Sequence, residues 1–201
     1  MAASSAMRVL VVYAHPVASS YNAALHERAL AALKRAGHEI DDLDLHGEGF
    51  SPVMSAAERE AYRDTAVNVG PVAPYVDRLR RAQGLVWIFP VWTFGVPAIM
   101  KGFLDRVFLP GVAFHLKDNG NIVPGLDNIR KLAAITTYGR TSWRARILVG
   151  DPVRKQMTRA VRWYCHPSTR CRYLALYDMN AATLARRQAF LDRVERAMSR
   201  F

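Results

Sequence analysis

The sequence predicts an α/β protein with a doubly wound sheet of five parallel strands in the order 2-1-3-4-5. Short runs of apolar and β-branched residues alternate with segments of helical periodicity, a pattern typical of βαβ units. The first run, Arg8–Ala14, is apolar almost throughout, as in a strand buried on both faces. The loops after the first, third and fourth runs are rich in polar and aromatic residues. Sheets of this order bind ligands at such loops, which favours this strand order over others.

The first 45 residues are expected to form a βαβ unit. After the first strand, Ser19 or Ser20 can cap a helix that runs to about Ala36 and is ended by Gly37. The apolar residues of this segment recur on one helical face. Glu39–Leu45 carries a weaker strand pattern through its isoleucine and leucines.

The later elements follow from apolar runs and from the positions of the prolines. Pro97 and Pro152 each stand where a helix can begin, because the first helical position tolerates proline best. Asp151 precedes Pro152 as an N-cap. The segment Pro110–Asn128, rich in Gly, Pro and Asn, is expected to be a long loop. The remaining expected elements are a short helix Ser55–Arg63, helix Pro74–Gln83, strand Gly84–Phe89, helix Ala98–Phe108, strand Arg130–Thr137, a helix from Pro152 to about Tyr164, strand Cys171–Tyr177 and helix Ala182–Met198.

Composition indicates one domain, residues 1–201, with residues 1–6 as a disordered leader. The chain has 201 residues, of which 51% are hydrophobic, and no repeat or linker divides it. No stretch approaches the ~20 apolar residues that span a bilayer, so a cytoplasmic protein without membrane insertion is expected. Cys165 and Cys171 have neither redox-pair nor zinc spacing, so ordinary thiols and no metal are expected.

The net charge of +11 admits three interpretations. It can be a solvated basic face, a site for a phosphate-bearing cofactor, or a nucleic-acid surface. The basic residues are spread along the chain with some clustering in Arg140–Arg172, and no RNA-binding or helix-turn-helix motif accompanies them. We therefore expect no nucleic-acid partner.

The first of the three loops, His15–Asn22, lies between a buried strand and a helix N-terminus. Free N–H groups and the positive end of the helix dipole favour an anion there, and Ser19, Ser20 and Asn22 add donors. No GxGxxG motif or Walker lysine is present, so a flavin phosphate suits the loop better than a Rossmann dinucleotide. The alternative is a simple N-cap with a packed His15.

The second loop, Phe89–Pro97, contains Trp92 and Phe94, which can wall a flat ring or can pack under the next helix. In the third loop, Thr136–Trp143, Gly139 permits a close approach of the backbone to a ligand. That loop can equally be a polar connection between a strand and a helix.

Four stretches together resemble the NAD(P)H:quinone oxidoreductase family of flavodoxin-like flavoenzymes. They are AHPVASSYN (Ala14–Asn22), LDLHGEGFSPVMS (Leu43–Ser55), FPVWTFGVPAIMKGFLDRVF (Phe89–Phe108) and ITTYG (Ile135–Gly139). The resemblance runs from Arg8 nearly to the end of the chain. It implies a flavodoxin-like fold, a bound FAD or FMN, and NADH or NADPH as reductant.

The resemblance also assigns roles by position. The first loop would hold the flavin phosphate, and the second and third would border the two edges of the isoalloxazine. Asp105 and Arg187 match positions near the adenosine in FAD-binding members, although both also suit helix surfaces. The cofactor-binding positions are then His15, Ser19, Ser20, Tyr21, Asn22, Pro90, Val91, Trp92, Thr93, Phe94, Thr136, Thr137, Tyr138, Gly139, Asp105 and Arg187.

The family pattern is not matched everywhere. Better-known members carry a Tyr and a His after the fourth-strand loop, where this chain reads Trp143-Arg144 and then Gly150-Asp151. That charge relay is absent or rebuilt, and acceptor preference does not carry over. The acceptor side is expected at Phe114, His115 and Trp143.

The expected function is a ping-pong oxidoreductase in which NAD(P)H reduces the flavin and a quinone-like acceptor then takes the same slot. Arg140, Arg144 and Arg146 are candidates for stabilising the reduced flavin or for holding an NADPH phosphate, or are solvated loop residues. A homodimer is expected. Two alternatives stay open: a flavodoxin-type electron carrier, which the positive charge disfavours, and a regulatory flavoprotein subunit of a membrane transporter.

Overall fold

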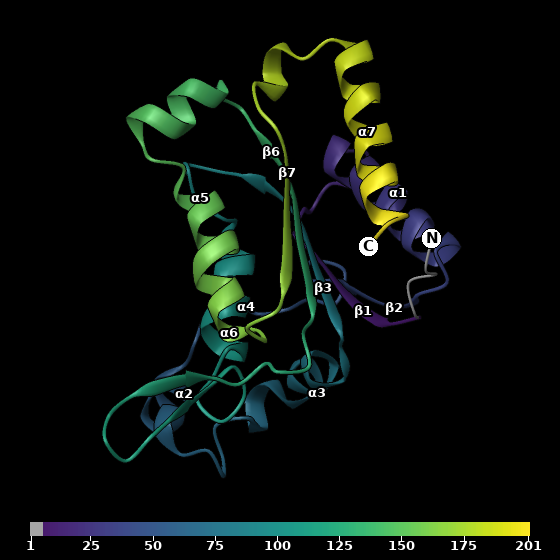
Figure 1. Cartoon of the computed structure of the whole chain (residues 1–201). Coiled ribbons are helices and arrows are strands. Elements are labelled where there is room, and N and C mark those ends of the chain that lie inside the picture. The colour runs from purple at the N-terminus through teal and green to yellow at the C-terminus, as the bar shows by residue number, and fades with distance from the viewer. Residues whose placement is uncertain (1–5) are drawn as a thin grey trace.

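The computed structural model describes residues 6–201, and most of the expected leader, residues 1–5, lies outside them. One parallel five-stranded sheet runs through the centre of the molecule in the order β2-β1-β3-β6-β7 (Figure 1). This order is equivalent to 2-1-3-4-5 once a separate two-stranded hairpin, β4–β5, is set aside. The predicted fold class and strand order are confirmed.

The bounds of the elements agree closely with the sequence pattern. The sheet strands are β1 Arg8–Tyr13, β2 Glu39–Asp44, β3 Gly84–Val91, β6 Lys131–Tyr138 and β7 Arg170–Leu176. The hairpin strands are β4 Phe114–Leu116 and β5 Ile122–Pro124. The helices are α1 Tyr21–Arg35, α2 Ala56–Glu60, α3 Ala73–Arg81, α4 Ala98–Val107, α5 Pro152–Lys155, α6 Arg162–Tyr164 and α7 Leu184–Met198, with π-helical segments at Arg144–Leu148 and Gln156–Val161.

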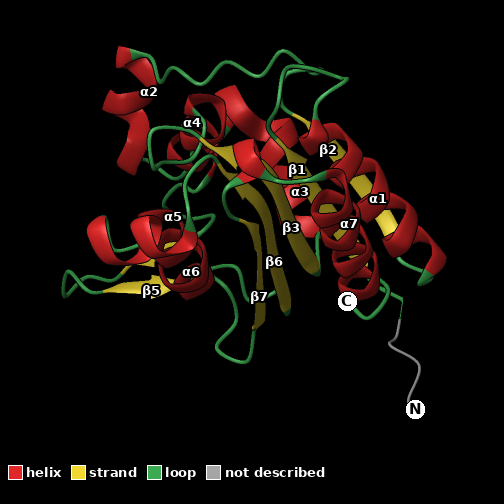
Figure 2. Cartoon of the chain, turned by 90° about the horizontal axis from the view of Figure 1, so that it is seen from above, coloured by secondary structure: helices red, strands yellow, loops and turns green. Residues whose placement is uncertain are grey.

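Helices cover both faces of the sheet, as a doubly wound fold requires (Figure 2). α1 and α7 pack on one face, where Val9 and Val11 of β1 contribute to the core. α3, α4 and the α5–α6 region cover the other face, where Leu10 and Val12 point. Strand residues therefore alternate between two apolar cores, and both cores bury the central strands from water.

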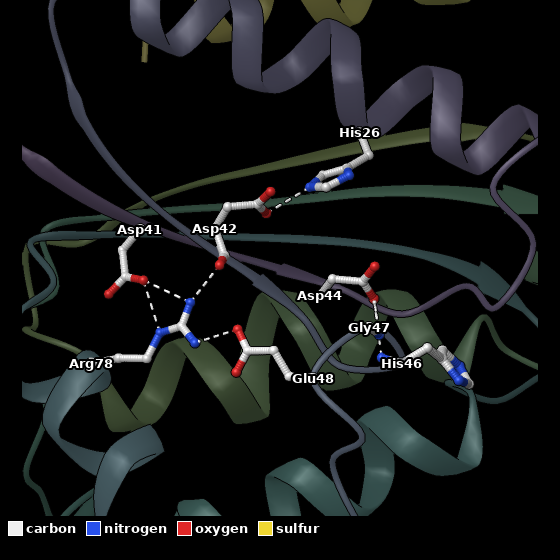
Figure 3. A network of polar contacts seen from close by, with 8 residues as sticks. All are labelled: His26, Asp41, Asp42, Asp44, His46, Gly47, Glu48 and Arg78. Atoms are coloured by element: carbon white, nitrogen blue, oxygen red, sulfur yellow. Dashed lines mark hydrogen bonds and ion pairs between the residues drawn. The ribbon is translucent and has the colours of Figure 1, made fainter.

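A polar network fastens the edge strand β2 to helix α3 (Figure 3). The guanidinium of Arg78 donates from Nε to Asp41 at 2.8 Å and from Nη1 to Glu48 at 2.6 Å. On the opposite face, the His26 ring lies 2.7 Å from Asp42 and stacks on Tyr13, with ring centroids 4.2 Å apart. The edge strand, whose own pattern is weak, is thus held by polar contacts from both layers.

Two elements were not predicted, and the third loop begins later than expected. The expected loop Pro110–Asn128 contains the β4–β5 hairpin, and a π-helical segment follows β6. Thr136 and Thr137 were placed both at the end of the expected strand Arg130–Thr137 and at the start of the third loop; they are buried residues of β6, paired in register with β3 and β7, as the strand prediction has them. The third loop therefore begins at Gly139, because the sheet pairing continues through both threonines to Tyr138.

Candidate functional site

The three predicted loops all leave the carboxyl-terminal edge of the sheet, because β1, β3 and β6 are adjacent and parallel. The chain order reverses at this point, with β2 on one side of β1 and β3 on the other. A crevice between diverging loops is the usual ligand site of such sheets. The topology thus brings the three loops to one place.

The first loop presents a helix N-terminus with unused donors. Ser20 is the N-cap of α1, and its hydroxyl accepts from the N–H of Ala23 at 3.1 Å. The N–H groups of the two residues between them, Tyr21 and Asn22, have no helical carbonyl within reach. No acidic residue occupies the first turn. An anionic group is therefore favoured at this position.

His15 shapes the entrance of the same loop. Its Nδ1 accepts the N–H of Val17 at 3.1 Å, and its ring makes an edge contact with Trp92 at 5.9 Å between centroids. Burial lowers the pKa of His15, and the positive field of His46 acts in the same direction. A neutral His15 with Nδ1 already bonded leaves Nε2–H as a donor.

Asn22 links the first loop to the fourth sheet strand. Its amide donates to the Thr137 hydroxyl at 3.1 Å, and its side chain is almost fully buried. Among residues 6–201, the Oδ1 atom of Asn22 has no hydrogen-bond partner, and neither does the buried hydroxyl of Thr136 or of Thr141. Buried polar atoms are normally paired, so this edge offers hydrogen bonds that a polar ligand can take up.

The second loop is a tight turn with an unusual backbone. Trp92 and Gly95 exchange two hydrogen bonds, of 3.1 and 2.8 Å, around the central residues Thr93 and Phe94. Both central residues are left-handed, with φ of 49° and 57°, which costs energy for residues other than glycine. Such backbone strain gathers at functional sites. The turn also leaves Trp92 46% exposed at this edge of the sheet, so its ring is accessible for stacking on a flat ligand.

The acceptor-side residues are not brought together within one chain. Trp143 follows β6 at the carboxyl edge and is 54% exposed, so it is not a core residue beneath the loop. Phe114 lies in the β4–β5 hairpin and packs on Tyr164, at the end of α6. His115 is exposed in the same hairpin. In Figure 1 the hairpin lies at the lower left, below the sheet, and the segment after β6 at the top.

Asp105 and Arg187, the two expected adenosine contacts, also lie apart. Asp105 is on α4 and pairs with Lys101, beside a cavity of about 560 Å³ that Phe114 also lines. Arg187 is on α7, on the opposite face of the sheet, and accepts from the Tyr21 hydroxyl through its carbonyl at 2.7 Å. Its side chain lines a second cavity, of about 600 Å³, with Ser19 and Tyr21.

The sequence interpretation missed a buried polar cluster behind the third loop. The carboxylate of Asp151 accepts from the hydroxyls of Tyr138 at 2.6 Å and Tyr177 at 2.7 Å. Tyr173 lies 2.5 Å from the Tyr138 oxygen. Burial raises the pKa of Tyr138 and Tyr173, and hydrogen bonding to Asp151 raises that of Tyr138 further. The signal in the sequence is faint, because Tyr138 and Asp151 are separated from each other and from the two later tyrosines by 13 to 39 positions.

Fold and site together define an α/β protein whose carboxyl edge suits a cofactor with both an anionic group and a flat ring. The family model for the flavodoxin-like fold matches residues 7–199. The chain therefore belongs to this flavodoxin-like family. Its homologues include NAD(P)H quinone oxidoreductases.

Individual relatives are consistent with that assignment. NAD(P)H dehydrogenase [quinone] 1 of Rattus norvegicus is 32% identical over 151 residues, which are 67% of this chain and 55% of that protein. The uncharacterized NAD(P)H oxidoreductase YcaK of Escherichia coli is 31% identical over 112 residues, 53% of this chain and 55% of that protein. The chain spans about half the length of these curated relatives.

Solved structures extend the likeness over the whole fold. Smu.1420 from Streptococcus mutans superposes with a TM-score of 0.84 at 27% identity, covering 97% of this chain and 100% of that one. An FMN-dependent NADH-azoreductase from Bacillus anthracis, in complex with FMN, has a TM-score of 0.77 at 16% identity, over 96% and 98% of the two chains. This second likeness shows the fold alone. Within residues 6–201, no helix combines the length and apolar character needed to cross a membrane.

Proposed function

We propose that this protein is a flavin-dependent NAD(P)H oxidoreductase that reduces quinones or similar flat acceptors in a ping-pong cycle. The observation that carries the proposal is the composition of the carboxyl edge. It combines free helix N–H groups, buried oxygens of Asn22 and Thr136 that have no partner within the described residues, and an exposed Trp92 on a strained turn. The quinone-reductase relatives support the same chemistry.

Each part of the edge has a task in this proposal. The N-terminus of α1, with Ser19, Ser20 and the Nε2–H of His15, would hold the flavin phosphate. Trp92 and the turn behind it would border the ring, and Thr136 to Gly139 would reach its other edge. A bound flavin would accept a hydride from the nicotinamide and pass two electrons to the acceptor. The protein's contribution is to position these partners and to stabilise negative charge that develops on the ring.

A homodimer would complete the acceptor slot. Phe114 and His115 are remote from Trp143 within one chain, although the resemblance assigns all three to the acceptor side. A second copy that placed its hairpin against the carboxyl edge would bring them together. Sedimentation at micromolar concentration should show a dimer, and a fully active monomer would contradict this part of the proposal.

Trp143 offers a direct test of the acceptor side. Its exposed ring can stack on a flat acceptor, which contributes about 1 kcal/mol beyond area burial. Trp143→Ala should therefore raise the KM for quinones about fivefold while flavin content and melting temperature stay unchanged. Trp163→Ala is a matched control, because Trp163 is 46% exposed, close to the 54% of Trp143, but lies on α6. An equal effect of both variants would remove Trp143 from the acceptor slot.

The decisive chemical experiment is identification of the cofactor. The protein should purify yellow with about one flavin per chain, and mass analysis of the released flavin will distinguish FAD from FMN. Turnover with NADH and with NADPH, using a free quinone as acceptor, then tests the activity. Flavin without nicotinamide turnover would favour an electron carrier. Absence of flavin, even after incubation with FAD and FMN, would refute the proposal.

A further inference from the structure

The tyrosine–aspartate cluster, which consists of Tyr138, Asp151, Tyr173 and Tyr177, is a closed hydrogen-bonded unit between the sheet and the segment after it. Asp151 is 5% exposed, and each of its carboxylate oxygens accepts one tyrosine hydroxyl. The rings of Tyr138 and Tyr177 stack with centroids 4.4 Å apart. A buried carboxylate with two charge-assisted hydrogen bonds is a strong geometric constraint.

The cluster holds both ends of one loop. Tyr138 ends β6 and Asp151 is the N-cap of α5. Residues 139–150 between them are called the arginine loop. The hydrogen bond between the Tyr138 and Asp151 side chains therefore joins the two ends of this loop. The N–H of Asp151 also donates to the carbonyl of Ala145 at 2.7 Å, and Ala145 is fully buried. Asp151 is left-handed, with φ of 46°, which a non-glycine residue adopts only when its surroundings enforce it.

The loop carries three arginines on its surface. Arg140, Arg144 and Arg146 are all exposed, and within residues 6–201 none of them forms an ion pair with a carboxylate. Arg146 lies over the Tyr177 ring, with 5.3 Å from Cζ to the ring centroid. Tyr177 thus contacts Asp151 through its hydroxyl and Arg146 through its ring. The position of this guanidinium depends on the cluster.

We propose that the arginine loop binds the 2′-phosphate of NADPH, with Arg146 as the principal contact and Asp151 as a positioning residue that acts through Tyr177. The inference rests on the proposed function, since it specifies which nicotinamide the same edge prefers. Guanidinium groups bind phosphate with paired, charge-assisted hydrogen bonds. The loop follows β6, so it lies at the edge where the reductant would bind, and its unpaired charges match a dianionic group.

Binding of a phosphate-bearing fragment tests the site without any turnover. Calorimetry on the full-length protein would compare adenosine 2′,5′-bisphosphate, adenosine 5′-monophosphate and inorganic phosphate. Arg146→Gln should weaken binding of the bisphosphate about tenfold, the loss of one charge-assisted contact, and should leave the monophosphate within about twofold. Arg196→Gln on α7 is the control, because it removes the same charge from an exposed site elsewhere.

The positioning role needs variants that leave Arg146 in place. Asp151→Asn and Tyr177→Phe should each weaken binding of the bisphosphate about three- to tenfold, in line with loss of one hydrogen bond. In turnover, both should raise the KM for NADPH without changing kcat or the KM for NADH. Tyr177→Phe keeps the ring under Arg146 and so tests the hydrogen bond even if Asp151→Asn folds poorly.

Three results would overturn the proposal. Equal weakening by Arg196→Gln would show a bulk-charge effect, and equal weakening of the monophosphate would place the contact away from the 2′-phosphate. Inorganic phosphate that binds as tightly as the bisphosphate would indicate a general anion site. The outcome is separable from that of the proposed function. A protein that binds the bisphosphate through Arg146 but oxidises neither nicotinamide would refute the activity while leaving the phosphate site in place.

Discussion

Thr93 lies in a strained turn, and replacing it by glycine should change folding stability and flavin affinity in opposite directions. Thr93 has φ of 49°, a conformation that costs a non-glycine residue about 1–2 kcal/mol. Glycine removes that cost but loses about 0.5–1 kcal/mol of conformational entropy on folding. Thr93→Gly should therefore stabilise the flavin-free protein by about 0.5–1 kcal/mol. In a domain of this size, this corresponds to a rise in melting temperature of about 1–4 °C.

Flavin binding should respond in the opposite direction. A glycine at position 93 makes the turn less ordered in the flavin-free protein, so ordering the turn on flavin binding costs about 1 kcal/mol of binding free energy. Flavin affinity, measured by fluorescence titration of the apoprotein, should fall about fivefold. Thr93→Ala is the matched control, because alanine keeps the left-handed strain and loses the same side-chain hydroxyl. If the glycine variant melts at or below the temperature of the alanine variant, the strain argument is wrong.

Three further outcomes are expected. Replacing Asn22 and Ser19 together by Ala should weaken flavin retention, because donors to the phosphate region and the bond to Thr137 are lost; unchanged affinity would remove the first loop from the site. Burial raises the pKa of Cys165 to about 12 and raises that of Cys171. Cys165, which is buried, should therefore react slowly with a disulfide reagent at neutral pH until the protein unfolds, the half-buried Cys171 should react faster than Cys165, and rapid labelling of Cys165 in the folded protein would contradict its burial. Burial lowers the pKa of His38, which accepts the N–H of Met7 at 3.3 Å. Near pH 6.5 the His38 ring is protonated more readily in the unfolded chain than in the folded one, so the melting temperature should fall as pH drops below about 6.5. His38→Asn should reduce that fall. An unchanged slope of melting temperature against pH would show that His38 does not cause it.

The fold could be predicted from the sequence because its determinants are local. Runs such as Gly84–Phe89 are apolar throughout, a pattern typical of a strand buried between two helical layers. Helix starts were marked by capping residues: Ser19 or Ser20 was expected to cap the first helix, and Ser20 does, while the Asp151-Pro152 pair opens α5. The order of the strands then followed from which loops carry chemistry, because ligands gather where the chain order reverses.

The missed elements depend on contacts between distant residues. The β4–β5 hairpin has only three residues per strand, and Gly, Pro and Asn around it are typical of a loop. The π-helical segment Arg144–Leu148 exposes Ile147 and Leu148, so it lacks the one-sided apolar face that predicts a helix. Its conformation is stabilised instead by the hydrogen bond that the N–H of Asp151 donates to the carbonyl of Ala145.

The candidate site was predicted at the level of loops, and its details were not. Asn22 and Trp92 were identified by position, but the link from Asn22 to Thr137 joins residues 115 positions apart. The left-handed pair Thr93 and Phe94 gives no sequence signal, because threonine and phenylalanine rarely adopt that conformation. Strain of this kind is imposed by tertiary structure, and local propensity argues against it.

The central claim is that this edge of the sheet holds a flavin that nicotinamide reduces and a quinone reoxidises. The most direct measurement is anaerobic absorbance of the purified protein during two successive additions. One equivalent of NADPH should bleach the oxidised flavin band with no acceptor present, and one equivalent of a free quinone should then restore it. A flavin band that persists with both NADPH and NADH, or a reduced flavin that a quinone leaves unchanged, would contradict the account.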